Sequence, residues 1–169
     1  MTRTSWFIMS SAAIALGAGC GGGTTEPGTE TFTATLDGAQ ERPTPVTTPA
    51  TGAGTFTLSA DGNTLTWNVT STGANNVVAS HIHVGGVNVA GPIVLSLFAG
   101  TAAANPPITG SVTRAAFVSP LGISFDALIS LMRSGDTYVN IHTDNGVAPA
   151  NTGPGDFPGG EIRGKINLQ

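Results

Sequence analysis

Short runs in which apolar and polar residues alternate limit the fold of this chain more than any other feature. Such runs occupy residues 32–36 (FTATL), 56–58 (FTL) and 65–69 (LTWNV), and the turn-forming residues 61–63 (DGN) separate the last two. Alternation with a period of two is typical of half-buried β-strands, and a polar turn between two such runs favours a hairpin. Further strands are expected at residues 77–84, 93–98, 109–113 and 161–168. We therefore expect an all-β domain, an antiparallel Greek-key sandwich or flattened barrel of about eight strands.

Two parts of the chain depart from this alternation. Apolar residues recur at helical spacing over residues 125–132, with Ser124 as the expected N-cap and Gly135 just beyond the end, which predicts one short helix. Residues 42–54 and 144–160 are rich in proline and glycine, so we expect irregular loops there. A loop as long as the second tends to be functional or mobile.

The N-terminal residues predict a secretory signal peptide. Arg3 supplies a positive charge and residues 6–18 form an apolar run that ends in small residues, so the signal is expected at residues 1–19. The apolar run is shorter than the ~20 residues that span a bilayer. We therefore expect a protein outside the cytoplasm. The basic residues are few and scattered, which does not favour nucleic acid as a partner.

The end of this segment resembles the lipobox of bacterial lipoproteins, in which a cysteine is lipidated. Residues 16–20 (LGAGC) carry the resemblance, although Gly17 stands where that family usually has leucine. It implies a lipid on Cys20, a flexible tether over residues 20–30, a domain over residues 31–169, and a membrane partner at the bacterial cell envelope (the outer membrane if the cell is Gram-negative). Ordinary secretion is the alternative. With the only cysteine lipidated, the domain would lack disulfides, cysteine metal ligands and a cysteine nucleophile.

All three histidines fall in strand-like segments. His81 and His83 are two residues apart, so they share one face of a strand while Ile82 occupies the other, and His142 ends a second run of the same kind. Imidazole is a common ligand of zinc and copper. The pattern predicts a site for one copper or zinc ion held by the three histidines. A structural hydrogen-bond cluster, or an accidental grouping on the surface, is the alternative.

The last expected strand has an apolar and a charged face. Ile162, Ile166 and Leu168 should point inward, and Glu161 and Arg163 should share the outward face. Glu161 is therefore a candidate carboxylate that orients a histidine ring, as carboxylates do at many metal sites, and Arg163 is a candidate to support the site beside it. The alternative is a structural role, in which Glu161 and Arg163 pair with residues of neighbouring strands and hold the long loop of residues 144–160 in place. No nucleophile-elbow sequence supports a hydrolase, so we assign no catalytic residue.

Several short motifs in a fixed order resemble the CHRD domain, named after chordin and widespread in secreted bacterial proteins. They are GAQERP at 38–43, ASHIHVG at 79–85, Gly-Pro at 91–92, YVNIHT at 138–143 and PGGEIRG at 158–164. The resemblance covers about residues 31–169. It implies an extracellular or envelope module, because in chordin these domains belong to an extracellular binding protein. The expected partner is then an extracytoplasmic protein or matrix component.

The histidine layout is also similar to the copper ligands of Cu/Zn superoxide dismutases, flattened barrels whose metal lies outside the barrel wall under long loops. That similarity implies copper-ligand roles for His81, His83 and His142. The chain lacks the further histidines of a zinc site and the disulfide, so a copper-only or vestigial site is the most it implies. We favour a non-enzymatic binding or structural module that holds one metal ion. The alternative is a copper-only, superoxide dismutase-like redox enzyme, in which Arg163 would guide the anion.

Overall fold

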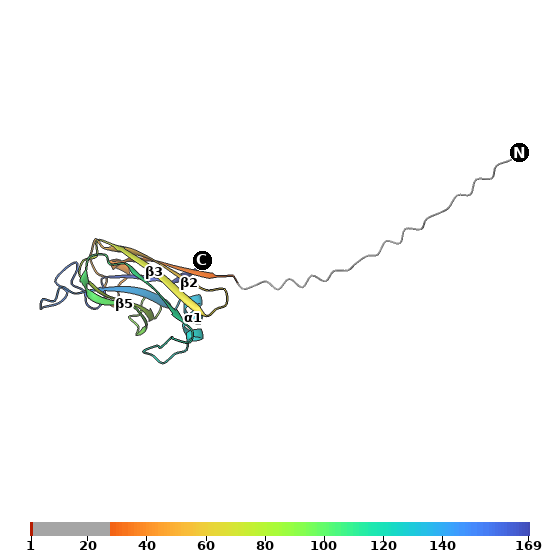
Figure 1. Cartoon of the computed structure of the whole chain (residues 1–169). Coiled ribbons are helices and arrows are strands. Elements are labelled where there is room, and N and C mark those ends of the chain that lie inside the picture. Colours follow the sequence, from red (N-terminus) through yellow and green to blue (C-terminus); the bar gives the residue numbers. More distant parts are fainter. Residues whose placement is uncertain (2–27) are drawn as a thin grey trace.

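The computed structural model describes Met1 and residues 28–169, and β-strands make up most of this part of the chain (Figure 1). The signal segment and Cys20, both predicted from the sequence, lie outside it. Within the described residues, no helix combines the length and the apolar character that crossing a membrane requires. The elements in chain order are β1 (Glu30–Asp37), the 3-10 helix η1 (Gly38–Gln40), β2 (Thr51–Leu58), β3 (Thr64–Thr72), β4 (Val77–Val84), β5 (Ile93–Ala103), β6 (Ile108–Thr113), α1 (Phe125–Ser134), β7 (Thr137–Thr143), β8 (Ile162–Lys165) and β9 (Asn167–Leu168).

The strands form one antiparallel sheet that curls into a nearly closed barrel. Their order is β5-β4-β7-β8-β1-β2-β3-β6, and β9 lies beside β1. The two edge strands, β5 and β6, contact each other, which brings the ends of the sheet together. The predicted all-β flattened barrel with one short helix is therefore confirmed. Figure 1 shows α1 at one end of the barrel and the long loop of residues 144–160 at the other.

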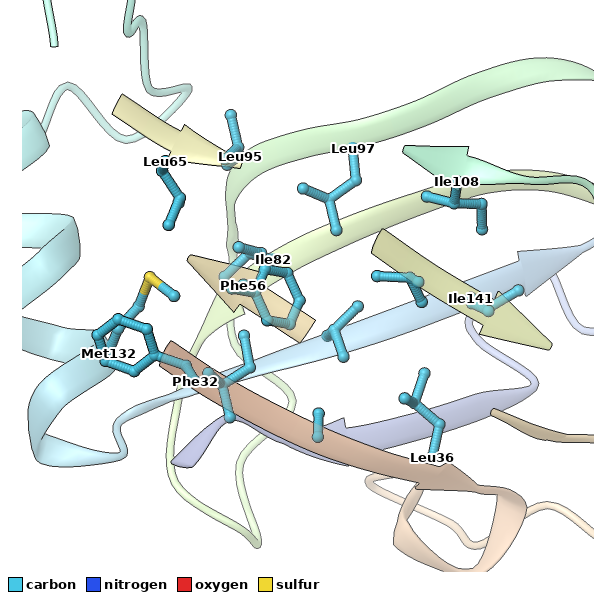
Figure 2. Close-up of a cluster of buried hydrophobic side chains, with 14 of the residues drawn as sticks. Phe32, Leu36, Phe56, Leu65, Ile82, Leu95, Leu97, Ile108, Met132 and Ile141 are labelled. Carbon is cyan, nitrogen blue, oxygen red and sulfur yellow. The ribbon is translucent and has the colours of Figure 1, made fainter. Parts of the chain in front are cut away.

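Alternation along the strands decides which side chains fill the barrel. Phe32, Phe56, Ile82 and Ile141 come from four different strands, are fully buried, and meet in the interior (Figure 2). Burial of each such side chain contributes roughly 1.5–3 kcal/mol. Because this core occupies the inner face, polar side chains on the same strands are directed to the outer face.

The predicted hairpin is confirmed, and one predicted loop is shorter than expected. β2 and β3 pair from Leu58 opposite Leu65 to Thr51 opposite Thr72. Strand β2 therefore includes residues 51–54, which the proline- and glycine-rich composition had assigned to a loop. Glycine is needed here because a Cβ on Gly52 would lie 2.7 Å from the carbonyl oxygen of Thr70 on the neighbouring strand.

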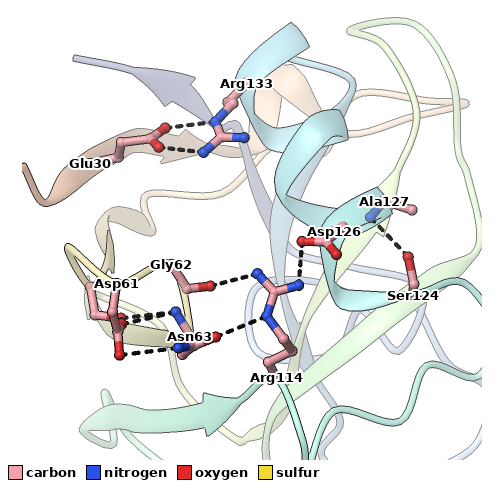
Figure 3. Close-up of polar contacts among 10 residues, drawn as sticks. Glu30, Asp61, Gly62, Asn63, Arg114, Ser124, Asp126, Ala127 and Arg133 are labelled. Atoms are coloured by element: carbon pink, nitrogen blue, oxygen red, sulfur yellow. Dashed lines mark hydrogen bonds and ion pairs between the residues drawn. The ribbon is translucent and has the colours of Figure 1, made fainter. Parts of the chain in front are cut away.

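The predicted helix is confirmed in its position and caps. The hydroxyl of Ser124 accepts a hydrogen bond from the backbone N–H of Ala127 (Figure 3). Gly135 ends the helix in the left-handed conformation. These are the usual N-cap and C-cap arrangements. The buried side chains of α1, including Leu128 and Met132, belong to the barrel core, so the helix covers one end of it.

The last predicted strand is divided in two. It separates at Ile166 into β8 and β9, and Ile162 and Ile166 are buried as predicted. The prediction was wrong for Leu168, whose side chain is 47% exposed. Strand β9 pairs with β1 alone, so no further strand of the described residues covers its other edge.

Candidate metal centre

The three histidines lie together on the outer face of β4 and β7. Ile82, between His81 and His83, points into the barrel and is fully buried, which leaves both imidazoles outside the wall. On β7, Val139 and Ile141 are likewise fully buried. This confirms that the histidines and their apolar neighbours occupy opposite faces of the strands.

The ring nitrogens converge on a common point. His81 Nδ1 lies 3.1 Å from His142 Nε2, and each of the three residues offers one nitrogen within 4.8 Å of the others. The ring centroid of His83 lies 5.7 Å from that of His81 and 5.8 Å from that of His142. The geometry can accept one metal ion, whereas the binding of an ion stays a prediction.

Hydrogen bonds to loop carbonyls set the tautomers of two rings. His83 Nδ1 lies 2.9 Å from the carbonyl oxygen of Gly91, and His142 Nδ1 lies 2.9 Å from that of Pro158. A carbonyl oxygen only accepts, so both Nδ1 atoms carry the proton and the Nε2 atom of each neutral ring keeps a lone pair. His81 Nδ1 therefore donates to His142 Nε2. Among the described residues, the buried Nε2 of His83 has no hydrogen-bond partner.

Burial keeps the imidazoles in the form that binds metals. Desolvation, reinforced by the neighbouring imidazoles, lowers the pKa of His81 to about 4. Desolvation also lowers the pKa of His83 to about 4, against the hydrogen bond to Gly91, and it lowers the pKa of His142. All three rings are therefore neutral at pH 7. A metal ion held between His81 Nδ1 and His142 Nε2 would require the proton of His81 to move to its other ring nitrogen.

Tyr138 fixes the loop that orients His83. Its ring stacks on His83 with centroids 4.9 Å apart and planes 9° apart, and its hydroxyl accepts a 2.9 Å hydrogen bond from the N–H of Gly91. Gly91 in turn leaves no space for a side chain, since a Cβ would lie 1.6 Å from the carbonyl oxygen of Val84. Tyr138 thus supports the imidazole of His83 in two ways: its ring stacks on the imidazole, and its hydroxyl holds Gly91, whose carbonyl oxygen accepts the hydrogen bond of His83.

Glu161 binds the loops that surround the cluster. It is fully buried, and its carboxylate accepts hydrogen bonds from the hydroxyls of Thr48 and Thr143 and from the N–H of Gly155. His83 and His142 instead donate their orienting hydrogen bonds to the carbonyl oxygens of Gly91 and Pro158. The predicted role of Glu161 behind the histidines can thus be exerted only through the loops, and it stays a prediction.

Arg163 lies one layer away from the histidines. Its guanidinium carbon is 3.4 Å from the centre of the Tyr138 ring. An imidazole and a guanidinium at these distances cannot share one face of the ring, so Tyr138 separates Arg163 from His83. Local sequence rules do not identify Tyr138 or the two carbonyls as supports, because a backbone oxygen has no signature in the sequence and Tyr138 stands out only as part of the YVNIHT motif.

The comparison with known families agrees with the extent of the barrel. A family model described as the CHRD domain matches residues 32–166, which reach from β1 to the link between β8 and β9. The matched span includes all three histidines as well as Tyr138 and Arg163. A search of curated proteins finds no match to the chain.

Proposed function

The chain belongs to the CHRD family, and we propose that its domain is a non-enzymatic binding module that holds one copper or zinc ion through His81, His83 and His142. The convergence of three imidazole nitrogens outside the barrel wall supports this proposal. Neutral imidazoles suit both metals, and three protein ligands leave a further position for water or for a group from a partner.

One observation carries the proposal: the Nε2 atom of His83. This atom is buried and has no hydrogen-bond partner among the described residues. It carries the lone pair of the ring, because the hydrogen bond to Gly91 holds the proton on Nδ1. Leaving a buried acceptor unpaired costs about 1–3 kcal/mol. A metal ion would give this atom a partner, and His81 and His142 lie where they can supply two further ligands.

A copper-only redox enzyme is the second candidate. The partial exposure of His81 favours it, because a substrate can reach the cluster from that side. Such an enzyme also needs a cation near the metal to attract its anionic substrate. Arg163 lies behind the ring of Tyr138 and therefore does not face the histidines. We consequently favour the binding module.

The proposed location is the bacterial cell envelope. The signal-like residues 1–19 and the lipobox-like residues 16–20 support a lipid on Cys20 and a membrane as one partner. An extracytoplasmic protein or matrix component would be the other partner. Labelling cells with a radioactive or alkyne-bearing fatty acid tests this part: a Cys20→Ser variant should lose the label.

Metal analysis of the full chain, purified without a histidine tag, tests the metal site. We expect one equivalent of copper or zinc in a titration followed by calorimetry. His83→Ala and His142→Ala should each weaken binding at least tenfold, since each removes one of three ligands. The matched control is Arg133→Gln, which changes an exposed pair with Glu30 and no contact of the cluster.

Two results would contradict the proposal. The metal site would be rejected by a wild-type protein that binds neither ion, or by histidine variants that bind as tightly as wild type. Superoxide turnover by the copper-loaded protein then separates the two candidates. Turnover no greater than that of free copper would reject the redox enzyme and leave the binding module.

A further inference from the structure

Basic side chains gather at one small cavity on the outer face of the barrel. Arg42, Arg163 and Lys165 line a cavity of about 130 Å³ together with Gln40, Tyr138 and the turn of residues 85–87. The whole chain has only six Lys and Arg residues and a net charge of −4. A cavity with three of these cations therefore needs an explanation.

The other basic residues of the described chain are neutralised by ion pairs. Arg114 pairs with Asp126, and Arg133 pairs with Glu30 (Figure 3). Within residues 28–169, Arg42, Arg163 and Lys165 form no ion pair of this kind. In this part of the chain, the cations without a carboxylate in direct contact are thus the ones that line the cavity.

Arg163 is a buried cation with few partners. Its side chain is held by the ring of Tyr138 and by one hydrogen bond of 2.8 Å from Nη2 to the carbonyl oxygen of Gly86, and the residue is only 2% exposed. A guanidinium has five N–H donors, and a buried charge is costly unless it is paired. An anion in the cavity would provide the missing acceptors.

Arg42 adds a second positioned guanidinium at the cavity. Nε donates to the side-chain oxygen of Asn88, and Nη1 donates to the backbone oxygens of Ala39 and Glu41. All three acceptors are neutral, so they fix the side chain without compensating its charge. Lys165 contributes more weakly, because its ammonium group lies against Gly135 at the end of α1.

Two carboxylates lie near Arg163, but neither forms an ion pair with it. Asp37 is opposite Arg163 in the pairing of β1 and β8, and its oxygens accept hydrogen bonds from the backbone and side-chain nitrogens of Gln40. Burial raises the pKa of Glu41 to about 7, so at neutral pH this group is only partly charged. The positive charge of the cavity is therefore incompletely balanced.

We propose that this cavity binds a small oxyanion, a carboxylate or phosphate group, between Arg163 and Arg42. Guanidinium groups bind both anions through paired, charge-assisted hydrogen bonds. The volume of about 130 Å³ is well above the roughly 10–15 Å³ that a cavity needs to hold one water molecule, so it leaves room for a group of this size. The site is separated from His83 by Tyr138, so the inference does not depend on the proposed metal site.

Nuclear magnetic resonance of the arginine Nε–H groups tests the site. Inorganic phosphate and, in a separate titration, acetate are added to the metal-free, ¹⁵N-labelled full chain. We expect saturable shifts of the Arg163 and Arg42 signals and no saturable shift of Arg114 or Arg133. Arg163→Gln should weaken binding about tenfold or more, as loss of a charge-assisted hydrogen bond does. Arg114→Gln is the matched control and should bind like wild type.

The two titrations also identify the class of anion. Saturation by either phosphate or acetate supports the site and names the chemistry of its ligand. If Arg163→Gln does not fold, which circular dichroism shows, Arg42→Gln decides and should also bind more weakly. The proposal is overturned if neither anion saturates the Arg163 signal, if all arginines shift equally, or if both folded variants bind like wild type.

Discussion

Replacing Glu41 by glutamine should stabilise the protein at alkaline pH and much less at acidic pH. Glu41 is 2% exposed, its Oε1 atom has no hydrogen-bond partner among the described residues, and Oε2 accepts one long hydrogen bond of 3.4 Å from Asn140. Within residues 28–169, the Oδ1 atom of Asn140 is also buried without a hydrogen-bond partner. A neutral side chain at position 41 with an N–H or O–H donor suits this surrounding better than a carboxylate does.

The size of the effect follows from the pKa of Glu41. Desolvation raises it from 4.5 to about 7, although the charges of Arg163 and Arg42 act in the opposite direction. Between these two values the folded state binds more protons than the unfolded state, so the stability linked to Glu41 is complete below pH 4.5 and is lost as the pH rises to 7. At about 1.4 kcal/mol for each tenfold change in proton affinity, the loss is on the order of 3 kcal/mol.

Urea denaturation of the metal-free wild type and of Glu41→Gln at several pH values measures this loss. Between pH 5 and pH 8, the free energy of unfolding of the variant should rise relative to wild type by about 2.5 kcal/mol. The histidines also titrate near this range, but they are common to both proteins and cancel in the difference.

The matched control for this measurement is Glu30→Gln. The hydrogen bond with Arg133 lowers the pKa of Glu30, so both its folded and its unfolded forms are largely ionised above pH 5. Its stability difference from wild type should be nearly constant over the same range. A difference for Glu41→Gln that does not change with pH, or that changes in the opposite direction, would refute the reasoning.

Four further substitutions test the supports of the site and the fold. Gly91→Ala places a Cβ 1.6 Å from the carbonyl oxygen of Val84, so the loop must move, and calorimetry should show weaker metal binding; unchanged affinity would contradict the role of this loop. Tyr138→Phe removes the hydroxyl that accepts from Gly91, and chemical denaturation should show a loss of about 1 kcal/mol. Ser124→Ala removes the helix N-cap and should cost about 1 kcal/mol in the same assay, whereas no loss would exclude a stabilising cap. Phe56→Ala empties part of the barrel interior and should cost about 3–5 kcal/mol, and a cost below 1 kcal/mol would show that the core is misassigned.

Local patterns were sufficient to predict most of the elements. The β2–β3 hairpin and α1 were predicted because their turn, caps and periodicity are all encoded by neighbouring residues. Errors arose where composition competed with long-range pairing. Thr51 to Gly54 contains two glycines that resemble a loop, yet these residues pair with both β1 and β3, and that pairing is invisible to a local rule.

The grouping of the three histidines was predicted from the sequence, but the groups that support them were not. The spacing of His81 and His83 fixes their common face, and the third histidine follows the same rule on another strand. That β4 and β7 are neighbours is a property of the topology, and local sequence rules do not determine it. The carbonyls of Gly91 and Pro158 come from loops, whose paths depend on the folded barrel.

Strand β7 keeps polar side chains buried on the outer face of the barrel. All seven of its residues, Thr137–Thr143, are buried, although alternate ones point away from the core. Tyr138, Asn140 and His142 are therefore covered by loops rather than by solvent. Apolar residues at these three positions would avoid the desolvation cost of buried polar groups. That cost includes Asn140 Oδ1 and, on the neighbouring strand β4, His83 Nε2, which have no hydrogen-bond partner among the described residues. A face that keeps such groups departs from what folding alone favours, and such departures are expected at functional sites.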